Sequence, residues 1–561
     1  MRAVERLVAL PLQSFLFVCT VPMLVILVWT SFHLVGADGS YNEFSGRNYA
    51  ALATAPDFYT ALLNAVVYSL GSAFVAITIG AAQAWLAERS NAPCRQVLYI
   101  SSIVSLGVPY VLYIVAWILF LGKNGPFNTW LRQIFGGTGV YVDVYSMGGM
   151  IFVEGMLWAP LAFLLLSSVF RNADASYEEA AAVCGAGIPT TMRRVTLGMA
   201  KPALFALGLL VFVRAAESFE VPALVGLPGY VTVLTTSIFK KVQHTVPPDV
   251  GSAAAFACIL LLLMAVLLKL YGRMSAEAHK YRTITGKGFR PRIVRLGKWR
   301  PVAGIFVLIV PCITVVIPVL VLLWTALLPF YQQVSIKAFS AISLQNFRLV
   351  LESGVYYDTM LNSLILSAAV ATAVVSVTSI MGWGIARRIA GSRSIDFLAA
   401  VPLAFPALVM GFAFLQIYLH ILPWLYGSLL SLVLVASIAF IPYGIRYSQI
   451  GVIQIHPELE EAASLAGAGH WTIFRRIILP LLAPALISCW LFVFLLAARA
   501  MSLLLLLVGP DSPVVAVALF DLWNNGQLNE LAALGCIWTA IMTMFSATFY
   551  WVARRFQLPF T

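Results

Sequence analysis

Long apolar stretches alternate with short polar connections along the whole chain. Twelve stretches are about 20 residues long or more, enough to cross the hydrocarbon core of a bilayer as an α-helix. They lie near 8–32, 60–87, 97–121, 147–170, 202–225 and 252–271, and near 302–328, 359–386, 397–421, 429–447, 484–508 and 530–552. A transmembrane β-barrel would instead show alternating segments of about ten residues. The pattern predicts an all-α membrane protein with twelve transmembrane helices.

The composition agrees with this prediction. Of the 561 residues, 61% are hydrophobic and 10% are charged, and the mean hydropathy is +0.92. A soluble domain has about 25% charged residues. The first apolar stretch follows Arg2 and Arg6, but it exceeds the roughly 7–15 apolar residues of a signal peptide. We therefore expect an uncleaved first span.

A basic segment divides the twelve spans into two sets of six. Residues 273–300 hold nine Lys or Arg and a single acidic residue, Glu277. We predict a first six-helix repeat at 1–272, a cytoplasmic linker at 273–300 and a second six-helix repeat at 301–561. Because six spans return the chain to the same side of the membrane, the two halves are expected to be parallel repeats.

Matching residues support the internal repeat. Asn64 aligns with Asn362 at an offset of 298, and Pro109 aligns with Pro406 at an offset of 297. Later in each half the offset falls to 282, so the first half has about sixteen additional residues. We place them in the external connection around 122–146.

The distribution of Lys and Arg predicts the orientation in the membrane. If the N-terminus is cytoplasmic, the loops on that side carry 25 of the 35 basic residues and the opposite loops carry seven. By the positive-inside rule, both termini and the linker are then cytoplasmic. The net charge of +12 thus reflects this topology and gives little support to nucleic-acid binding, because the basic residues flank the spans. The basic linker is expected to lie near anionic lipid headgroups.

One polar segment occurs twice, between the fourth and fifth span of each half. Residues 178–204 read EEAAAVCGAGIPTTMRRVTLGMAKPAL and residues 460–486 read EEAASLAGAGHWTIFRRIILPLLAPAL, with 14 identities in 27 positions. We name the segments that contain them the first EAA loop (176–201) and the second EAA loop (457–483). An ordinary amphipathic loop would have no reason to be repeated in this way.

The spacing predicts the local structure of both loops. Ser176 and Glu179 have the spacing of a capping box, and Pro457 occupies a plausible first helical position. Glycines at 185 and 187, and at 467 and 469, are expected to end the two helices and turn the chain. Each loop is thus predicted to form a compact cytoplasmic projection suited to contact with another protein.

The loops resemble the motif of the permeases of binding-protein-dependent ABC importers, in which Glu-Ala-Ala is followed by three residues, Gly, nine residues and Ile-x-Leu-Pro. The second loop matches throughout, at Glu461, Ala462, Ala463, Gly467, Ile477, Leu479 and Pro480. The first matches at Glu179, Ala180, Ala181, Gly185 and Leu197. It departs from the motif at Val195 and Gly198, so unequal coupling of the two loops stays open.

The resemblance implies a type I ABC importer permease fold and a set of partners. In that family each EAA loop is a coupling helix seated in a cleft of an ATP-hydrolysing subunit. Two copies of an ABC ATPase and a periplasmic or lipid-anchored solute-binding protein are therefore expected partners, in a bacterial inner membrane. The chain has no G-x-x-x-x-G-K-[ST] segment, so ATP is expected to bind to the partner subunits and no cofactor to this chain.

The solute is predicted less sharply than the machinery. The double length, the segment ESFEVPALVGLPGY at 217–230 and TITGKGFRPR at 283–292 look like the ferric-iron group of permeases. Relatives of that group import thiamine, phosphonates, polyamines or sulfate. We therefore expect ferric iron, with those solutes as alternatives.

Charged residues within the spans are candidates for the translocation pathway, because charge in the bilayer core is costly. They are Glu154, Arg214, Glu217, Glu220 and Arg499. Alignment pairs Arg499 with either Glu217 or Arg214. These residues are expected to face the pathway or to bridge the two repeats, and an ion pair without solute contact is equally open.

Enzymatic and metal-binding roles find little support. The seven cysteines and six histidines form no metal-like spacing, and no catalytic constellation stands out. A proton-coupled transporter of the major facilitator type also has six plus six spans. It would not explain the two EAA loops, and the loops after the second and eighth spans match its signature poorly.

Overall fold

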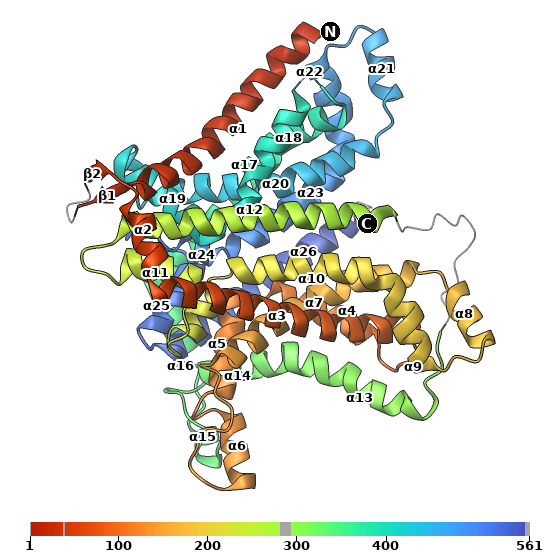
Figure 1. Ribbon diagram of the computed structural model, residues 1–561, viewed down its shortest axis with the longest axis vertical. Coiled ribbons are helices and arrows are strands. Elements are labelled where there is room, and N and C mark those ends of the chain that lie inside the picture. Colours follow the sequence, from red (N-terminus) through yellow and green to blue (C-terminus); the bar gives the residue numbers. More distant parts are fainter. Residues whose placement is uncertain (1, 37–39, 281–292, 390, 556–561) are drawn as a thin grey trace. The chain divides into compact units, whose positions relative to one another are not determined.

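The computed structural model describes residues 2–36, 40–280, 293–389 and 391–555. The regular elements of the described residues are helices, apart from one short antiparallel ribbon, β1 (His33–Val35) and β2 (Tyr41–Phe44) (Figure 1). The first repeat contains α1 (Arg2–Ser31), α2 (Arg47–Thr54), α3 (Pro56–Arg89), α4 (Gln96–Gly107), α5 (Tyr110–Leu121), α6 (Pro126–Phe135), α7 (Met147–Asn172), α8 (Ser176–Val183), α9 (Ile188–Thr191), α10 (Leu197–Glu217), α11 (Leu234–Gln243) and α12 (Val250–Lys280).

The second repeat follows the same order without a counterpart of α6. It contains α13 (Arg300–Pro311), α14 (Ile317–Ala326), α15 (Ile336–Ser340), α16 (Gln345–Glu352), α17 (Gly354–Ala386), α18 (Ser392–Ala400), α19 (Ala407–His420), α20 (Leu429–Ile453), α21 (Glu458–Leu465), α22 (His470–Ile473), α23 (Leu479–Ala498), α24 (Met501–Leu504), α25 (Val515–Asn524) and α26 (Leu528–Arg555). The connection from α5 to α7 occupies 122–146, whereas the equivalent connection from α19 to α20 occupies only 421–428. The additional residues of the first half are thus where the offsets predict them.

The helices account for the expected transmembrane segments. Eleven described helices are long and apolar enough to span a membrane, and the number is twelve if one bent pair counts as a span. The bent pair is the ninth predicted span: residues 392–404 and α19 meet at 102°. The third and ninth spans are therefore broken helices, whereas the apolar pattern predicts continuous ones.

The two breaks have the same cause. Pro109 immediately precedes α5 and Pro406 immediately precedes α19, with nearly equal backbone angles (φ −57, ψ 135 and φ −54, ψ 140). A proline lacks the N–H that would continue the helix and forces the preceding residue out of the helical region. The paired prolines thus divide equivalent spans.

Equivalent asparagines connect equivalent parts of the two repeats. The Asn64 side chain donates to Thr232 O (2.9 Å) and that of Asn362 to Pro513 O (3.2 Å). A second pair of asparagines, Asn48 and Asn346, is related by the same offset. Their side chains likewise donate to backbone carbonyls, here at the end of the first span of each half. Asn48 donates to Ser31 O and His33 O, and Asn346 donates to Ala326 O and Leu328 O.

The two compact units of the fold do not coincide with the two repeats. One unit contains residues 1–50, 241–261 and 347–561, and the other contains 51–240 and 262–346. The first span of each repeat therefore packs within the unit that holds the core of the other repeat. The boundaries at 272 and 301 remain a prediction about the sequence repeats.

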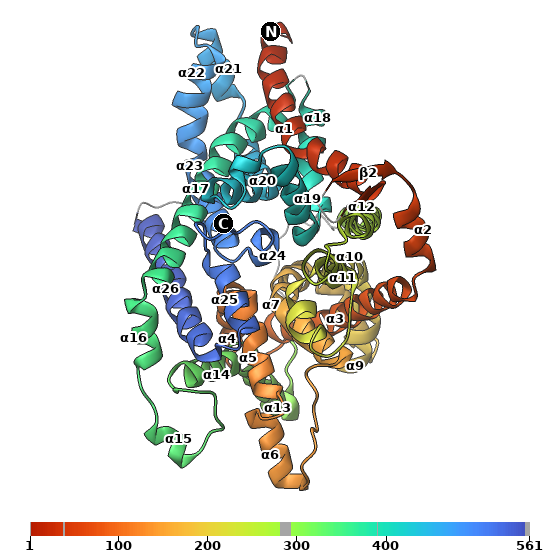
Figure 2. The same cartoon turned by 90° about the vertical axis from the view of Figure 1, so that its left-hand side faces the viewer.

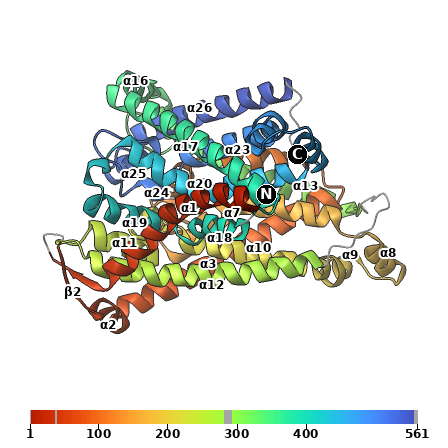
Figure 3. The same cartoon turned by 90° about the horizontal axis from the view of Figure 1, so that it is seen from above.

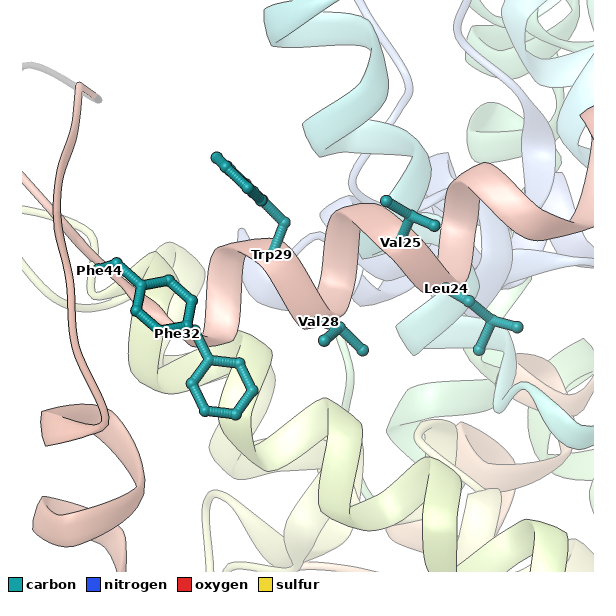
Figure 4. A pocket seen from close by; sticks show the side chains of 6 residues that line it. All are labelled: Leu24, Val25, Val28, Trp29, Phe32 and Phe44. Atoms are coloured by element: carbon teal, nitrogen blue, oxygen red, sulfur yellow. The ribbon is translucent and has the colours of Figure 1, made fainter.

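In the first unit, α1 lies against helices of the second repeat. Leu16 is fully buried in a cluster that includes Met381, Ile395 and Ile441, and the Gln13 side chain donates to Gly391 O (3.1 Å). Further along α1, an open apolar groove of about 480 Å³ faces outward (Figure 4). It is lined by Leu24, Val25, Val28, Trp29, Phe32 and Phe44.

In the second unit, α13 and α14 lie against helices of the first repeat. Ala303 and Val307 of α13 belong to a buried cluster with Leu98 of α4 and Phe163 of α7. At the opposite end, the Tyr331 hydroxyl donates to Leu119 O at the end of α5 (2.8 Å). Apolar sequence alone predicts that such spans are buried, but not which helices bury them.

The fifth and eleventh spans end earlier than predicted. Helix α10 stops at Glu217 and α23 stops at Ala498, about eight to ten residues before the ends of the apolar stretches. In each repeat the helix breaks for two residues, 218–219 and 499–500, and a separate short helical segment follows, the π-helix Pro222–Gly226 and α24. The apolar pattern continues across these breaks and therefore does not reveal them.

The packing of α1 on the second repeat can be tested by cross-linking. We expect Gln13→Cys and Ser392→Cys to be joined by a short bifunctional maleimide, because Gln13 contacts Gly391. A protease site inserted between residues 280 and 293 would then release two fragments that stay covalently joined on a denaturing gel. Val18→Cys, at an exposed position of α1, is the matched control. Separation of the fragments in the Gln13 variant would contradict the exchange of first spans.

Candidate functional site

Both EAA loops contain an eight-residue helix that ends in a left-handed glycine. Helix α8 is followed by Gly185 (φ +80), and α21 by Gly467 (φ +85). The next N–H closes the turn in each case, from Ala186 to Ala181 O (2.9 Å) and from Ala468 to Ala463 O (3.0 Å). This is a Schellman motif, which favours glycine because other residues rarely adopt positive φ.

The helix starts differ from the sequence prediction. Ala175 caps α8 without a side-chain hydrogen bond, so Ser176 and Glu179 do not form a capping box. Asp174 accepts a hydrogen bond from the Ser176 N–H instead (2.9 Å), and this bond and one from the Ser176 side chain hold the pKa of Asp174 below its ordinary value. Pro457 is the residue before α21 and not its first helical residue.

One glutamate in each loop attaches the short helix to the end of the second span of its repeat. Glu178 pairs with Arg89, the last residue of α3, and Glu460 pairs with Arg387, which directly follows α17. Each arginine also donates to a carbonyl just before the loop helix, Arg89 to Ala173 O and Arg387 to Ile455 O. The two glutamates are 282 residues apart, as are the two carbonyls, and this is the offset between the EAA loops. The two arginines are 298 residues apart, which is the offset between Asn64 and Asn362 in the second spans. The two networks are therefore equivalent.

The remaining carboxylate contacts distinguish the two networks. In the first loop the Thr196 hydroxyl donates to Glu178 (2.7 Å), and in the second the Trp383 indole N–H donates to Glu460 (3.1 Å). The second ion pair is close, with Arg387 Nε and Glu460 Oε1 at 2.6 Å. In the first, Arg89 Nη1 and Glu178 Oε2 are 3.7 Å apart.

Burial separates the two ion pairs further. The Arg89 side chain is fully buried and that of Glu178 is 4% exposed, whereas Arg387 and Glu460 are 18% and 16% exposed. Arg89 Nε and Nη1 form no hydrogen bond with any described residue. A buried charge without full hydrogen bonding is costly, so Arg89 depends strongly on its carboxylate.

The end of the linker holds the first network in place. Val294 forms a parallel bridge with Ser90: its N–H donates to Arg89 O (2.9 Å), and its carbonyl accepts from the Asn91 N–H (3.2 Å). The Leu296 N–H then donates to the Asn91 side chain (3.0 Å). A cavity of about 370 Å³ lies between this segment and the first EAA loop, bounded by Glu178, Ile188 and Arg295 among others.

The outer faces of the loops are apolar at equivalent positions. Val183 and Leu465, at the ends of the two short helices, are 89% and 90% exposed. Tyr177 and Leu459 are also exposed and are likewise related by the offset of the two loops. In Figure 3, α8 and α9 lie beyond the end of α10. Each loop thus presents a small apolar surface away from its bundle.

The motif residues divide between this outer surface and the core. Exposed positions are Glu179, Ala180, Gly185, Glu461, Ala462 and Gly467, while Ala181 and Ala463 are half-buried. Leu197, Ile477 and Leu479 pack against buried clusters at the bases of α10 and α23, and Pro480 is exposed on the first turn of α23. The motif therefore combines an outer face with its attachment.

Comparison with known protein families supports this division into two equivalent halves. The model of the family "binding-protein-dependent transport system inner membrane component" matches residues 76–277 and 377–558. The chain belongs to this family. Each match includes one EAA loop, so the protein is a double-length permease.

Curated relatives include permeases with different printed solutes. The chain is 23% identical over 476 residues to the ferric transport system permease protein FbpB of Actinobacillus pleuropneumoniae, covering 82% of this chain and 66% of the relative. It is 25% identical over 565 residues to the probable ABC transporter permease protein y4fN of Sinorhizobium fredii, covering 96% and 94%. The sulfate transport system permease protein CysW of Escherichia coli is 29% identical over 213 residues, covering 38% of this chain and 70% of the relative. The chain thus spans slightly less than two thirds of the length of the FbpB relative.

The charged residues inside the permease lie in two places. Glu154, Arg214, Glu217 and Glu220 belong to the unit that contains 51–240, and Arg499 belongs to the other unit. Arg214 and Glu217 form an ion pair within α10 (2.5 Å). Glu154 is buried and accepts from the Trp158 indole N–H (2.9 Å) and the Ser218 hydroxyl (3.3 Å). Their role in translocation stays a prediction.

The buried pair of the first loop gives a stability prediction. Glu178→Gln removes the charge that compensates the fully buried Arg89, and we expect a loss of about 3–5 kcal/mol in unfolding free energy. Glu179→Gln, one residue away and exposed, should change it by less than about 0.5 kcal/mol. Thermal unfolding of the purified permease in detergent measures both.

A double substitution separates charge from shape at this site. Arg89→Met combined with Glu178→Leu removes both charges, and we expect most of the stability to return because no buried charge is left uncompensated. If Glu178→Gln were as stable as the unmodified permease, the ion pair would not be what attaches the loop.

Proposed function

We propose that the permease is the membrane subunit of an ATP-driven importer in a bacterial inner membrane, with both termini and both EAA loops in the cytoplasm. Two copies of an ABC ATPase bind the loops, one copy each, and a solute-binding protein delivers the solute to the opposite side. ATP binds to the ATPase subunits. The positive charge of the loops on the proposed cytoplasmic side supports this orientation.

The observation that carries the proposal is the pair of equivalent outer faces. Val183 and Leu465 protrude from two short helices that are built alike. Each helix ends in the same glycine turn and is attached by a glutamate–arginine ion pair. Each also lies at the same distance along the chain from the span that follows it, the fifth span in the first repeat and the eleventh in the second. A single exposed apolar side chain is common on protein surfaces, but here both loops leave two of them exposed at equivalent positions, Tyr177 with Val183 and Leu459 with Leu465. Two such surfaces built alike fit two copies of one partner.

The loops are connected to the membrane by nearly continuous helices. Helices α9 and α10 are joined through a π-helical segment at Met192–Thr196, and α22 and α23 through one at Phe474–Ile478. At a rise of about 1.5 Å per residue, movement at a loop is transmitted tens of ångströms along one rigid element. These elements end at Arg214 and Glu217 in the first repeat and at Arg499 in the second.

The proposed mechanism is alternating access. Closure of the ATPase dimer moves both loops, and α10 and α23 carry this movement to the charged residues at their far ends. Glu154, Arg214, Glu217, Glu220 and Arg499 are proposed to line the pathway or to stabilise one of its states. Charged residues within a membrane protein usually serve such a role, because the free-energy cost of their desolvation would otherwise bring no functional benefit.

Ferric iron is the solute that we propose. The printed function of the FbpB relative, which aligns with 82% of this chain, supports it. The sulfate permease CysW and a relative named for 2-aminoethylphosphonate transport, PhnU of Salmonella choleraesuis, align with 38% and 43% of the chain. Sulfate, phosphonate, thiamine or a polyamine is the second candidate. Family membership leaves a proton-coupled transporter of the major facilitator type without support.

ATPase docking can be tested at the two outer faces. We expect Val183→Asp with Leu465→Asp to abolish co-purification of the partner ABC ATPase from the same cells, because a charge replaces the apolar contact at each loop. Stability should be unchanged, since both side chains are about nine-tenths exposed. Val246→Asp, equally exposed but outside both loops, is the matched control. Undiminished ATPase binding by the double variant would contradict docking at these loops.

The solute can be tested by reconstitution. Proteoliposomes that contain the permease, its ATPase and its solute-binding protein should accumulate ⁵⁵Fe from a ferric chelate only when ATP is enclosed with the ATPase. Labelled sulfate and thiamine are the parallel substrates. Uptake of one of these in place of iron would overturn the solute but keep the importer, whereas proton-driven uptake without ATPase would overturn both.

A further inference from the structure

Helix α6 is the one described helix of the first repeat that has no counterpart in the second, and coupling to an ATPase does not explain it. Its apolar side chains fall on one face at helical spacing: Phe127, Trp130, Leu131, Ile134 and Phe135. Trp130, Ile134 and Phe135 are 53%, 53% and 69% exposed. A soluble surface rarely leaves three such large side chains together in water.

The helix is held rigidly, so its apolar face is presented in a defined direction. The buried Asn128 side chain donates to Leu121 O (2.7 Å) before the helix and to Val142 O (2.8 Å) after it, and accepts from the Tyr141 and Val142 N–H groups (3.0 Å each). Arg132 donates to Lys123 O (2.8 Å). These bonds connect both ends of the segment to the end of α5.

The direction of α6 crosses that of the neighbouring spans. Within its unit, α3 and α13 run horizontally in Figure 1 while α6 runs vertically, and in Figure 2 α6 is again vertical. Helices α3 and α13 carry candidate membrane spans, and α6 extends across their direction. By length and composition α5 and α6 together also form a candidate span, Tyr110–Phe135, but the direction of α6 across α3 and α13 favours a position along the membrane plane.

A second segment of the same unit exposes apolar side chains at the same edge. The connection that contains α15 presents Phe330, Val334, Ile336 and Phe339, of which Ile336 is 91% exposed. In Figure 1, α15 and α6 lie at a similar level along the direction of the spans. The outward faces of α13 and α14 lead toward this edge and are apolar too, with Ile305, Leu308, Leu320 and Leu323 exposed. One apolar medium that contacts all these segments explains their shared exposure.

The charge of the segment also fits a membrane surface. Residues 122–146, the connection between α5 and α7, contain two basic residues, Lys123 and Arg132, and one acidic residue, Asp143, which lies beyond the end of α6. Aromatic rings continue from Phe120 at the end of α5 to Phe127 (5.8 Å between centroids) and Trp130 (6.0 Å). Aromatic side chains with flanking basic residues are typical of helices that lie at the boundary between lipid headgroups and acyl chains.

We propose that α6 is an interfacial anchor that inserts Trp130, Ile134 and Phe135 into the lipid leaflet on the side opposite the first EAA loop. Lys123 and Arg132 then face the lipid phosphates. The anchor fixes the depth and tilt of the broken third span, since only 122–125 separate α6 from α5. The proposal holds whatever solute the permease carries and whether or not the EAA loops bind an ATPase.

The test is a depth measurement on the full chain in nanodiscs of phosphatidylethanolamine and phosphatidylglycerol, without partner proteins. Nitroxide labels are placed at Trp130→Cys and Phe135→Cys, in a background where the exposed Cys94, Cys184 and Cys312 are serine. We expect both labels to be more accessible to oxygen than to a water-soluble nickel chelate. Gln133→Cys, an exposed polar position at the edge of the apolar face of α6, is the matched control and should be more accessible to the nickel chelate than the other two labels.

Other outcomes overturn the proposal. Labels at 130 and 135 that are as accessible to the nickel chelate as the label at 133 would show that the face is in water. If they became protected only when the solute-binding protein is added, the face would be a protein docking site. A second measurement guards against misfolding: Trp130→Asp with Phe135→Asp should lower the thermal midpoint in nanodiscs relative to the unmodified chain, and leave it unchanged in detergent.

Discussion

The ion pair between the end of the second span and the first glutamate of each EAA loop is the interaction on which the candidate site depends. A helix of eight residues is not stable by itself, because nucleation costs more than so few hydrogen bonds return. Glu178 and Glu460 attach α8 and α21 to Arg89 and Arg387, and the same arginines bind the carbonyls that precede the helices. With the inner face held in this way, Val183 and Leu465 are left to point outward.

The attachment matters because of what the loops are joined to. Each loop continues through a π-helical segment into the fifth span of its repeat, while its glutamate binds the second span of that repeat. Force applied at a loop therefore reaches two spans at once. The exchange of first spans adds a further constraint, since each compact unit contains helices of both repeats and neither repeat is a self-contained bundle.

Much of the fold follows from the sequence by simple physical rules. Apolar length predicts the spans, Pro109 and Pro406 mark the broken helices, and Gly185 and Gly467 end the loop helices at positive φ. The partners of the first spans could not be predicted, because an apolar helix surface shows that Leu16 is buried but not by what. The ends of α10 and α23 were missed for a related reason: the apolar pattern continues past Glu217 and Ala498, although the helix breaks there and a separate short helical segment follows.

The site was predicted more fully in its outer face than in its attachment. The Glu-Ala-Ala pattern directs attention to Glu179 and Glu461, which are exposed, whereas the neighbouring Glu178 and Glu460 carry the ion pairs. A signal for the attachment exists in the sequence: Arg89 and Arg387 recur at the same offset that relates Asn64 to Asn362. Recognising it requires knowing that the end of the second span lies beside the loop, and only the fold shows that.

The linker accounts for the difference between the two loops. A double-length chain has one connection between its repeats, and the described end of this connection lies beside the first loop, where Val294 bonds to the Arg89 and Asn91 backbone. The linker covers Arg89, so its ion pair with Glu178 is shielded from water, and the charged atoms of this pair are 3.7 Å apart. The ion pair of Arg387 and Glu460 in the second loop is more exposed, and its charged atoms are 2.6 Å apart. The first loop is therefore held by backbone bonds to the linker as well as by charge, and the second by charge and the Trp383 contact. Fusion of the repeats thus makes the two attachments unequal even though their outer faces are alike.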